Sequence, residues 1–299
     1  MRLFTFGCSF TNYNWPTWAD LIGLEYGAFH YNWGYAGLGN RAIAERLAEC
    51  HARMAIVPGD TVLIQWTSPL RHDYMRTNVR KLEGTYWATH GSIFSKENSK
   101  VFDYKWINTF WDEKAYLIHT LNNITLAIQF LEGIGCKWMM TSMNDMQLVG
   151  NELNDDTFGG EYQLKDKMRK FYDVFPDLMF YKEHIWDKYQ DRWVDPIINA
   201  IDESSEFSWK FRFDKNRDVE KSYPVRDGLW DEAHPTPRQH AIWMLMLKDR
   251  MGLDPRLTHE QGQLIHQFEK IKENTKTFKE FEDAIMNTEW FIQRQYRGL

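Results

Sequence analysis

The sequence of 299 residues has little cysteine, no excess of positive charge and no long apolar run. Its three cysteines, Cys8, Cys50 and Cys136, are an odd number without paired or metal-type spacing. This usage is typical of reduced thiols in a cytosol-like compartment. We expect Cys50 and Cys136 to be small, buried packing residues.

The charge balance and the short apolar segments exclude two classes of partner. With a formal net charge of -6 and a pI near 5.9, the chain has no general basic field to favour nucleic-acid binding. No apolar stretch reaches the roughly 20 residues that cross a bilayer, and the apolar start after Arg2 is too short for a signal peptide. The sequence therefore predicts a cytoplasmic protein without a nucleic-acid or membrane partner.

The chain does contain a large supply of core residues, with 43% hydrophobic and 16% aromatic side chains. Apolar runs typical of buried strands alternate with segments of helical periodicity. We expect strands at 2–6, 29–32 and 136–143, and a turn that runs into a further strand within 58–66. Helices are expected at 18–24, 41–55, 113–132 and in a segment that ends at 252. This alternation predicts an α/β layered fold with a mostly parallel sheet, formed by residues 1–253.

Two segments do not follow this alternation of strands and helices. Residues 144–226 are rich in Trp, Phe and Asp, and we interpret them as a long insertion over a sheet edge or site mouth. Residues 254–299 form a C-terminal helical appendage, whose amphipathic helices could pack on the main domain or on a second copy. A homo-oligomer is therefore an open alternative. Helices are expected in the two segments at 163–174, 183–189, 258–274 and 277–294.

Gly7-Cys8-Ser9 ends the first expected strand, and Ser9 is a candidate nucleophile. A serine hydroxyl needs a base within hydrogen-bond reach and a group that orients the base. Asp231 precedes His234 by three residues, so its carboxylate could turn back to the ring Nδ1 and leave Nε2 for the serine. The structural alternatives are a strand-end hydroxyl and an acidic residue near a helix start. Cys8 is a second possible nucleophile, but alternation along a strand points it away from Ser9, so we expect it to pack in the core.

Four segments resemble the sequence blocks of the SGNH hydrolases, also called GDSL-type esterases and lipases. Gly7-Cys8-Ser9 is similar to the first block, usually Gly-Asp-Ser, with cysteine in place of aspartate. "NWGYAGLGN" (32–40) is similar to the second block, and "VLIQW" (62–66) to the third strand. Asp231, His234 and Pro235 are similar to the last block.

The resemblance implies a three-layer, flavodoxin-like fold and acyl transfer to water without a cofactor. Ser9 would attack an ester carbonyl, with His234 as general base and then acid. Asp231 would orient the histidine. The backbone N–H groups of Ser9 and Gly37 would hold the oxyanion.

The third block departs from the family pattern. The family places an asparagine after this strand as a further oxyanion donor, whereas here the chain reads Trp66-Thr67-Ser68-Pro69-Leu70-Arg71. Thr67 or Ser68 could donate a hydroxyl, Asn40 could reach over from the second block, and Arg71 could supply a cation. Ordinary turn chemistry at a strand end is an equal alternative for the two hydroxyls.

The substrate is expected to be a small-molecule or saccharide ester, from which a short acyl group such as O-acetyl is removed. Most of the tryptophans should pack in the core, whereas Trp33, Trp66, Trp230 and Arg71 are predicted to line the substrate pocket. His240 has no ligand-type neighbours in sequence, so we expect a structural role and no metal. Two other readings stay open: a non-catalytic binding or assembly protein with the same fold, and an acyltransferase.

Overall fold

Four parallel strands form the central sheet of the protein. The computed structural model describes residues 1–75, 87–89, 91–94, 99–150, 168–202, 209–212, 228–232 and 234–297. The strand order is β2 (His30–Asn32), β1 (Leu3–Phe6), β3 (Thr61–Trp66) and β6 (Lys137–Ser142). This is the order 2-1-3-4 of a flavodoxin-like sheet. Every residue of β1 and β3 is buried, as expected for parallel strands covered on both faces, so the predicted fold class is confirmed.

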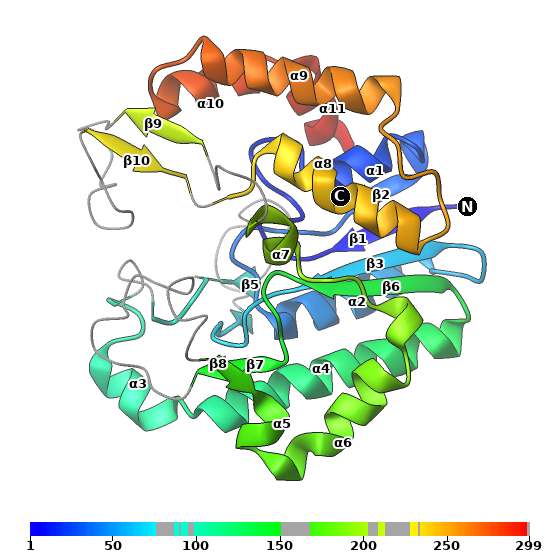
Figure 1. Cartoon of the computed structure of the whole chain (residues 1–299), viewed down its shortest axis with the longest axis vertical. Helices are drawn as coiled ribbons and strands as arrows, with labels where there is room; N and C mark the ends of the chain where they lie inside the picture. The colour runs from blue at the N-terminus through cyan, green and yellow to red at the C-terminus, as the bar shows by residue number, and fades with distance from the viewer. Residues whose placement is uncertain are drawn as a thin grey trace.

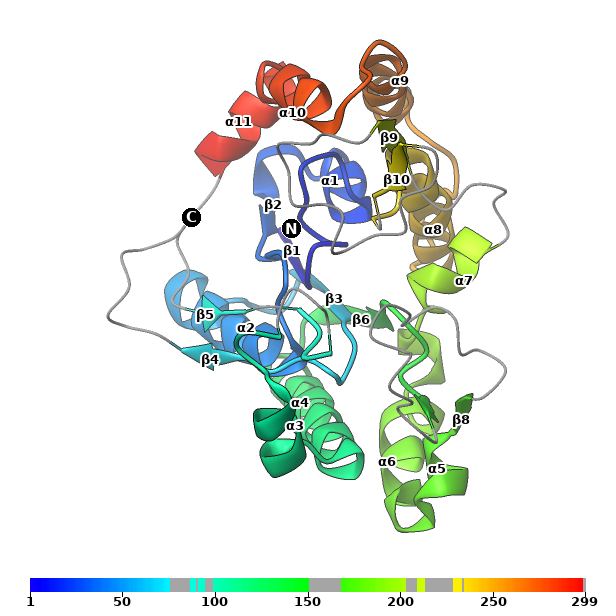
Figure 2. The ribbon, with the colours of Figure 1, turned by 90° about the vertical axis from the view of Figure 1, so that its left-hand side faces the viewer.

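Helices cover both faces of the sheet and make three layers (Figure 1). On one face lie α1 (Trp18–Gly23) and α8 (Pro237–Arg250). On the other lie α2 (Asn40–Met54) and α4 (Glu113–Ile134), as the view turned by 90° also shows (Figure 2). Among the described residues, no helix is long and apolar enough to cross a bilayer.

Local sequence signals account for the ends of these helices. Thr236 caps α8 by accepting a hydrogen bond from the backbone N–H of Gln239, and Pro237 occupies the first turn, where its missing N–H costs nothing. Helix α4 runs through Gly133 and ends at Gly135, whose φ of 74° is the left-handed conformation that favours glycine.

Part of the segment interpreted as an insertion completes the sheet. Trp193 forms an isolated parallel bridge with Met140 of β6, and the Val194 N–H donates to the Met140 carbonyl at 2.9 Å. The predicted helix over 163–174 is wrong at 168–170, because strand β8 (Met168–Lys170) pairs antiparallel with β7 (Leu148–Gly150). Strand pairing overrides local propensity there.

The rest of the segment is a series of short helical turns. These are α5 (Phe171–Val174), 3-10 turns at Pro176–Leu178 and Gln190–Arg192, α6 (Met179–Lys182), a π-helical turn (Glu183–Asp187) and α7 (Ile197–Asp202). The helix expected at 183–189 is therefore a shorter turn. Between β3 and α4 lie the antiparallel strands β4 (Tyr74–Met75) and β5 (Trp87–Ala88) and helix α3 (Tyr104–Phe110), none of which the sequence pattern predicts.

The C-terminal segment folds into α9 (His259–Glu273), α10 (Phe278–Met286) and α11 (Glu289–Arg297). The single helix expected at 277–294 is wrong, because Thr288 interrupts it and its hydroxyl accepts the Phe291 N–H at 3.2 Å. Phe268 and Phe281 join the hydrophobic core that also contains the sheet. A domain boundary at 253/254 and a homo-oligomer through these helices stay predictions.

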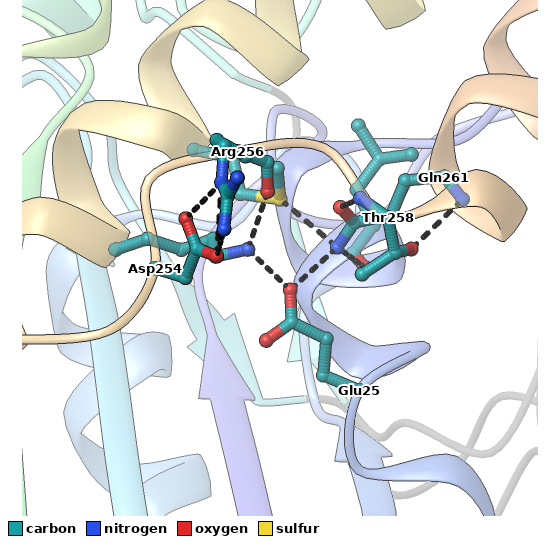
Figure 3. Close-up of polar contacts among 8 residues, drawn as sticks. Glu25, Asp254, Arg256, Thr258 and Gln261 are labelled. Carbon is teal, nitrogen blue, oxygen red and sulfur yellow. Dashed lines mark hydrogen bonds and ion pairs between the residues drawn. The ribbon is translucent and has the colours of Figure 1, made fainter.

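A buried polar contact fastens α9 to the sheet domain (Figure 3). Lys248, which is 2% exposed, donates to Glu25 Oε1 at 2.6 Å and to the Arg256 carbonyl at 2.8 Å. Gln261 donates its amide to the same Glu25 oxygen and to the Leu21 carbonyl, both at 2.9 Å. One carboxylate therefore joins α8, α9 and the end of α1.

We expect Gln261→Ala to lower the free energy of unfolding by about 1–3 kcal/mol, because it removes the two hydrogen bonds that tie α9 to Glu25 and to the Leu21 carbonyl. Gln263→Ala, on the exposed side of the same helix, is the matched control and should change stability by less than about 0.5 kcal/mol. Urea unfolding followed by tryptophan fluorescence measures both values. Equal stabilities for the two variants would contradict the role given to Gln261.

Candidate active site

The loop that follows β1 carries Ser9 at the carboxyl end of the sheet, where open α/β sheets place their sites. Gly7 is required by close packing, since a Cβ there would lie 2.1 Å from Thr11 Oγ1. The Cys8 carbonyl accepts the N–H groups of Thr11 at 2.9 Å and Asn12 at 3.1 Å, which tightens the turn. Ser9 is 7% exposed, and neither its hydroxyl nor its backbone N–H bonds to a described residue. The O–H and the backbone N–H of Ser9 therefore donate to no other residue in the described part of the chain.

His234 lies against this loop from the far end of the chain. Its ring is edge-on to Phe10, the neighbour of Ser9, with centroids 5.6 Å apart. It stacks on Tyr13 with centroids 3.7 Å apart and an interplanar angle of 17°. The structure therefore brings the serine loop and the histidine loop together. It records no hydrogen bond between Ser9 Oγ and His234 Nε2.

The carboxylate at His234 belongs to Glu232. Glu232 Oε1 lies 2.5 Å from His234 Nδ1, and its side chain is 5% exposed. In the neutral ring, a proton on Nδ1 that is donated to this carboxylate leaves Nε2 with a lone pair. The sequence prediction gave this position to Asp231, whose side chain lies outside the described residues. Sequence reasoning missed Glu232 because it matched the family spacing, although a second carboxylate stands two residues before the histidine.

The backbone before His234 explains the position of Glu232. Strand β10 (Leu229–Asp231) pairs antiparallel with β9 (Lys210–Arg212), and the Glu232 N–H donates to the Trp209 carbonyl at 3.0 Å. The last contact anchors Glu232 just after the strand. At this position, shortly before α8, the Glu232 side chain is buried.

The second block forms a loop over the end of the sheet. Gly37 has a φ of 81°, which favours glycine, and its N–H donates to no described residue. Arg71 Nη1 donates to the Leu38 carbonyl at 3.0 Å. Asp73 accepts the N–H groups of Gly39 at 2.8 Å and Ala42 at 3.0 Å, and so caps α2.

Asp73 was missed by the sequence reading, since it caps a helix that begins more than thirty positions earlier. Burial raises the pKa of its carboxyl, against the opposite effect of the two backbone N–H donors. The loop that carries Gly37 is thus fixed by side chains from the segment after β3.

The predicted oxyanion donors after β3 have different surroundings. Asn40 donates both amide hydrogens, to the Thr67 carbonyl at 2.9 Å and to Thr120 Oγ1 at 3.2 Å, and is therefore engaged elsewhere. Ser68 Oγ accepts the Leu70 N–H at 3.1 Å, which is turn chemistry. Arg71 is held at Leu38. Thr67 Oγ1 is buried and has no partner among the described residues.

The tryptophans predicted to contact substrate are mostly core residues. Trp33 is 2% exposed and stacks on Phe6, and Trp66 is fully buried with its Nε1 donating to Met140 Sδ. The prediction is wrong for these two, because strand and loop ends bury them inside the sheet layers. The side chain of Trp230 lies outside the described residues. Trp209, a residue the sequence reading did not assign to the site, is half-buried beside Trp15 with centroids 5.1 Å apart.

All three cysteines are free and buried, which confirms their predicted packing role. Burial raises the pKa of Cys50 to about 12 and that of Cys136 to about 11, so both stay thiols near neutral pH. Cys8 is fully buried, so its thiol is not accessible to act as a nucleophile. Among the described residues, no group of three or more His, Cys, Asp or Glu side chains could hold a metal ion.

His240 lies directly behind the site on α8. It is fully buried, faces Phe10 edge-on at 6.3 Å, and neither ring nitrogen has a partner among the described residues. Burial, aided by the nearby His234, lowers the pKa of His240 to about 3. The ring is therefore neutral in the folded protein near neutral pH, which agrees with the predicted structural role.

The chain is similar to GDSL-type lipases and esterases of solved structure. A GDSL-like lipase from Bacteroides thetaiotaomicron is 13% identical, with 84% of this chain and 87% of that chain covered and a TM-score of 0.39. A psychrotrophic esterase from Pseudoalteromonas sp. is 11% identical, with coverages of 84% and 96% and a TM-score of 0.39. A lipolytic G-D-S-L family member from Veillonella parvula is 14% identical, with coverages of 83% and 97% and a TM-score of 0.39.

No family model matches the chain, and no curated protein sequence matches it. At these identities and TM-scores the likeness transfers no activity. The reaction has to be derived from the residues of this chain.

His240→Leu should make the stability of the protein less sensitive to acid. The unfolded chain protonates His240 below its ordinary pKa of about 6.5, whereas the folded state keeps it neutral, so stability falls as the pH drops from 6.5 toward 3. The wild type should lose about 2 kcal/mol between pH 8 and pH 5 through this group, and the variant should not. Denaturant unfolding at both pH values measures the difference. His266→Leu, at an exposed position on α9, is the control and should keep the wild-type pH dependence.

Proposed function

We propose that the protein is a serine ester hydrolase that removes a short acyl group, such as the O-acetyl group of a saccharide. The observation that carries the proposal is the meeting of two distant segments. The loop with the uncommitted Ser9 hydroxyl contacts the imidazole of His234, whose Nδ1 is bonded to Glu232. These are the nucleophile, base and orienting acid that acyl transfer through serine needs.

In the proposed reaction, His234 Nε2 takes the proton of Ser9 Oγ as the oxygen attacks the ester carbonyl carbon. The tetrahedral intermediate collapses when the C–O bond to the alcohol breaks, and Nε2-H protonates the departing oxygen. Water then gives a proton to Nε2 and attacks the acyl-enzyme. Collapse releases the carboxylic acid and returns the proton to Ser9.

Glu232 holds the imidazole through both steps and stabilises its charged form. The uncommitted N–H groups of Ser9 and Gly37 are the proposed oxyanion donors, with Thr67 Oγ1 as the third in place of the asparagine. In apo structures catalytic hydrogen bonds are often long and tighten only when substrate binds, so the open Ser9–His234 pair is compatible with this role.

The substrate class is proposed from the surroundings of Ser9. A serine that is 7% exposed suits a small acyl group better than a long chain. The half-buried Trp209 beside Trp15 offers an aromatic face of the kind that packs on sugar rings. The altered third block favours one alternative, a binding protein that has lost catalysis.

Ser9→Ala should abolish hydrolysis of p-nitrophenyl acetate, with a loss in kcat/KM of at least about 10³-fold. A fluorophosphonate probe should label the wild type, because the serine oxygen forms a bond to phosphorus as fluoride leaves, and should not label Ser9→Ala. Ser99→Ala, at an exposed position, is the control and should behave as the wild type. Equal labelling of wild type and Ser9→Ala, or no turnover of any ester by the wild type, would favour the binding protein.

Glu232→Gln and Asp231→Asn distinguish the two carboxylates that precede His234 in the sequence. Glu232→Gln should lower kcat/KM by about 10²–10⁴-fold, because an amide can no longer hold the required tautomer. Asp231→Asn should change it by less than about 5-fold if the contact at Nδ1 belongs to Glu232. A large loss for Asp231→Asn with full activity for Glu232→Gln would return the acid role to Asp231. Circular dichroism of both variants checks that the fold is kept.

A further inference from the structure

Tyr13 contacts both members of the His234–Glu232 pair. Its ring stacks on the imidazole with centroids 3.7 Å apart, and its hydroxyl donates to Glu232 Oε1 at 2.9 Å. We propose that Tyr13 is a positioning residue that fixes the plane of His234 through its ring and the carboxylate of Glu232 through its hydroxyl. This role rests on the proposed hydrolysis and adds a residue to it.

The carboxylate needs a second donor to hold one orientation. Glu232 Oε1 accepts from His234 Nδ1 at 2.5 Å and from the Tyr13 hydroxyl at 2.9 Å. With one donor the carboxylate could swing about its Cγ–Cδ bond, whereas two donors from different segments define its position. The carboxylate is buried, so water does not compete freely for this oxygen.

The imidazole needs a second restraint for the same reason. A single hydrogen bond at Nδ1 leaves the ring free to turn about that bond, which would sweep Nε2 away from the serine. The Tyr13 ring lies nearly parallel to the imidazole, with an interplanar angle of 17°, and its face blocks that rotation. Phe10 approaches the imidazole edge-on, at an interplanar angle of 67°, and gives the ring a second wall.

Tyr13 is itself held by a rigid neighbour. The Trp15 ring meets Tyr13 edge-to-face with centroids 4.6 Å apart and an angle of 84°. Trp15 is fully buried, and its Nε1 donates to the Pro235 carbonyl at 2.8 Å, next to His234. The series of contacts therefore begins at His234, passes through Tyr13 and Trp15, and returns to the histidine loop at Pro235.

Tyr13 also lies on the same loop as Ser9, four positions later. The turn between them is closed by the Cys8 carbonyl, which accepts the Thr11 and Asn12 N–H groups. Because one short segment carries both the nucleophile and the support of the base, a movement of this loop would move both groups together. The geometry thus couples the position of Nε2 to that of Oγ.

Two substitutions separate the ring of Tyr13 from its hydroxyl. Tyr13→Leu removes both contacts and should lower kcat for p-nitrophenyl acetate by about 10–100-fold, with KM changed by less than about 3-fold. Tyr13→Phe keeps the stack and should recover most of this loss, to within about 10-fold of the wild type. Tyr104→Leu and Tyr104→Phe are the matched controls, because Tyr104 is 76% exposed on α3, and both should match the wild type.

Proton NMR tests the positioning without any turnover. The Nδ1 proton of His234 should give a low-field signal in the wild type, identified by its loss in His234→Gln. Tyr13→Phe should shift this signal, and Tyr13→Leu should broaden it through exchange with water. Thermal unfolding shows whether Tyr13→Leu is folded. If it is not, the shift in Tyr13→Phe decides.

The possible results of these experiments distinguish the positioning role of Tyr13 from the proposed hydrolase activity. An unchanged Nδ1 signal in folded Tyr13 variants, or a Tyr13→Leu effect on KM alone, would overturn the role of Tyr13 even in an active esterase. A wild type without esterase activity whose Nδ1 signal still responds to Tyr13→Phe would support the positioning contact and reject the hydrolase. Loss of kcat in Tyr13→Leu with recovery in Tyr13→Phe and a changed signal supports both.

Discussion

The arrangement of the site depends on the contacts that the buried Trp15 indole makes. The indole lies between the serine loop and three segments that come more than 190 positions later: its Nε1 bonds to the Pro235 carbonyl, and its ring meets Trp209 and Phe281. A fully buried indole N–H requires an acceptor, and here the acceptor is the backbone beside His234. This hydrogen bond joins the first block to the last, together with the contacts of Phe10 and Tyr13 with His234. At least one of the many aromatic residues, Trp15, thus has a specific structural role.

The second and third blocks depend on a different device, which is capping by side chains from distant positions. Asp73 closes the start of α2, and Arg71 holds the loop before it at Leu38. Asn40 in turn holds the end of β3 at Thr67. The two loops therefore support each other across the carboxyl edge of the sheet. The residues that replace the family asparagine act first as structural ties, and Thr67 Oγ1 is a buried hydroxyl without a partner in the described part of the chain.

Sequence patterns predicted the sheet and its main helices because buried parallel strands and long amphipathic helices carry strong periodic signals. The strand at 62–66 and the helix from Glu113 are found where expected. The pattern failed at β8, where pairing with β7 decides the structure, and at Thr288, where one capping residue splits a helix. The sequence blocks pointed to Ser9 and His234, whose loops the structure brings together, but the choice between neighbouring carboxylates depends on side-chain direction, which one sequence does not encode locally. The burial of Trp33 and Trp66 depends on how the layers pack, so the sequence pattern could not predict it either.

The hydrogen bond from Tyr13 to Glu232 spans 219 positions of the sequence. Contacts of such separation close large loops and form late, because the entropy of the connecting chain has to be overcome first. During synthesis the serine loop leaves the ribosome long before the histidine loop and α10 exist. A nascent chain therefore holds its proposed nucleophile without a base. Any proposed activity would arise only when the last helices have docked, so that chemistry and completion of the fold coincide in time.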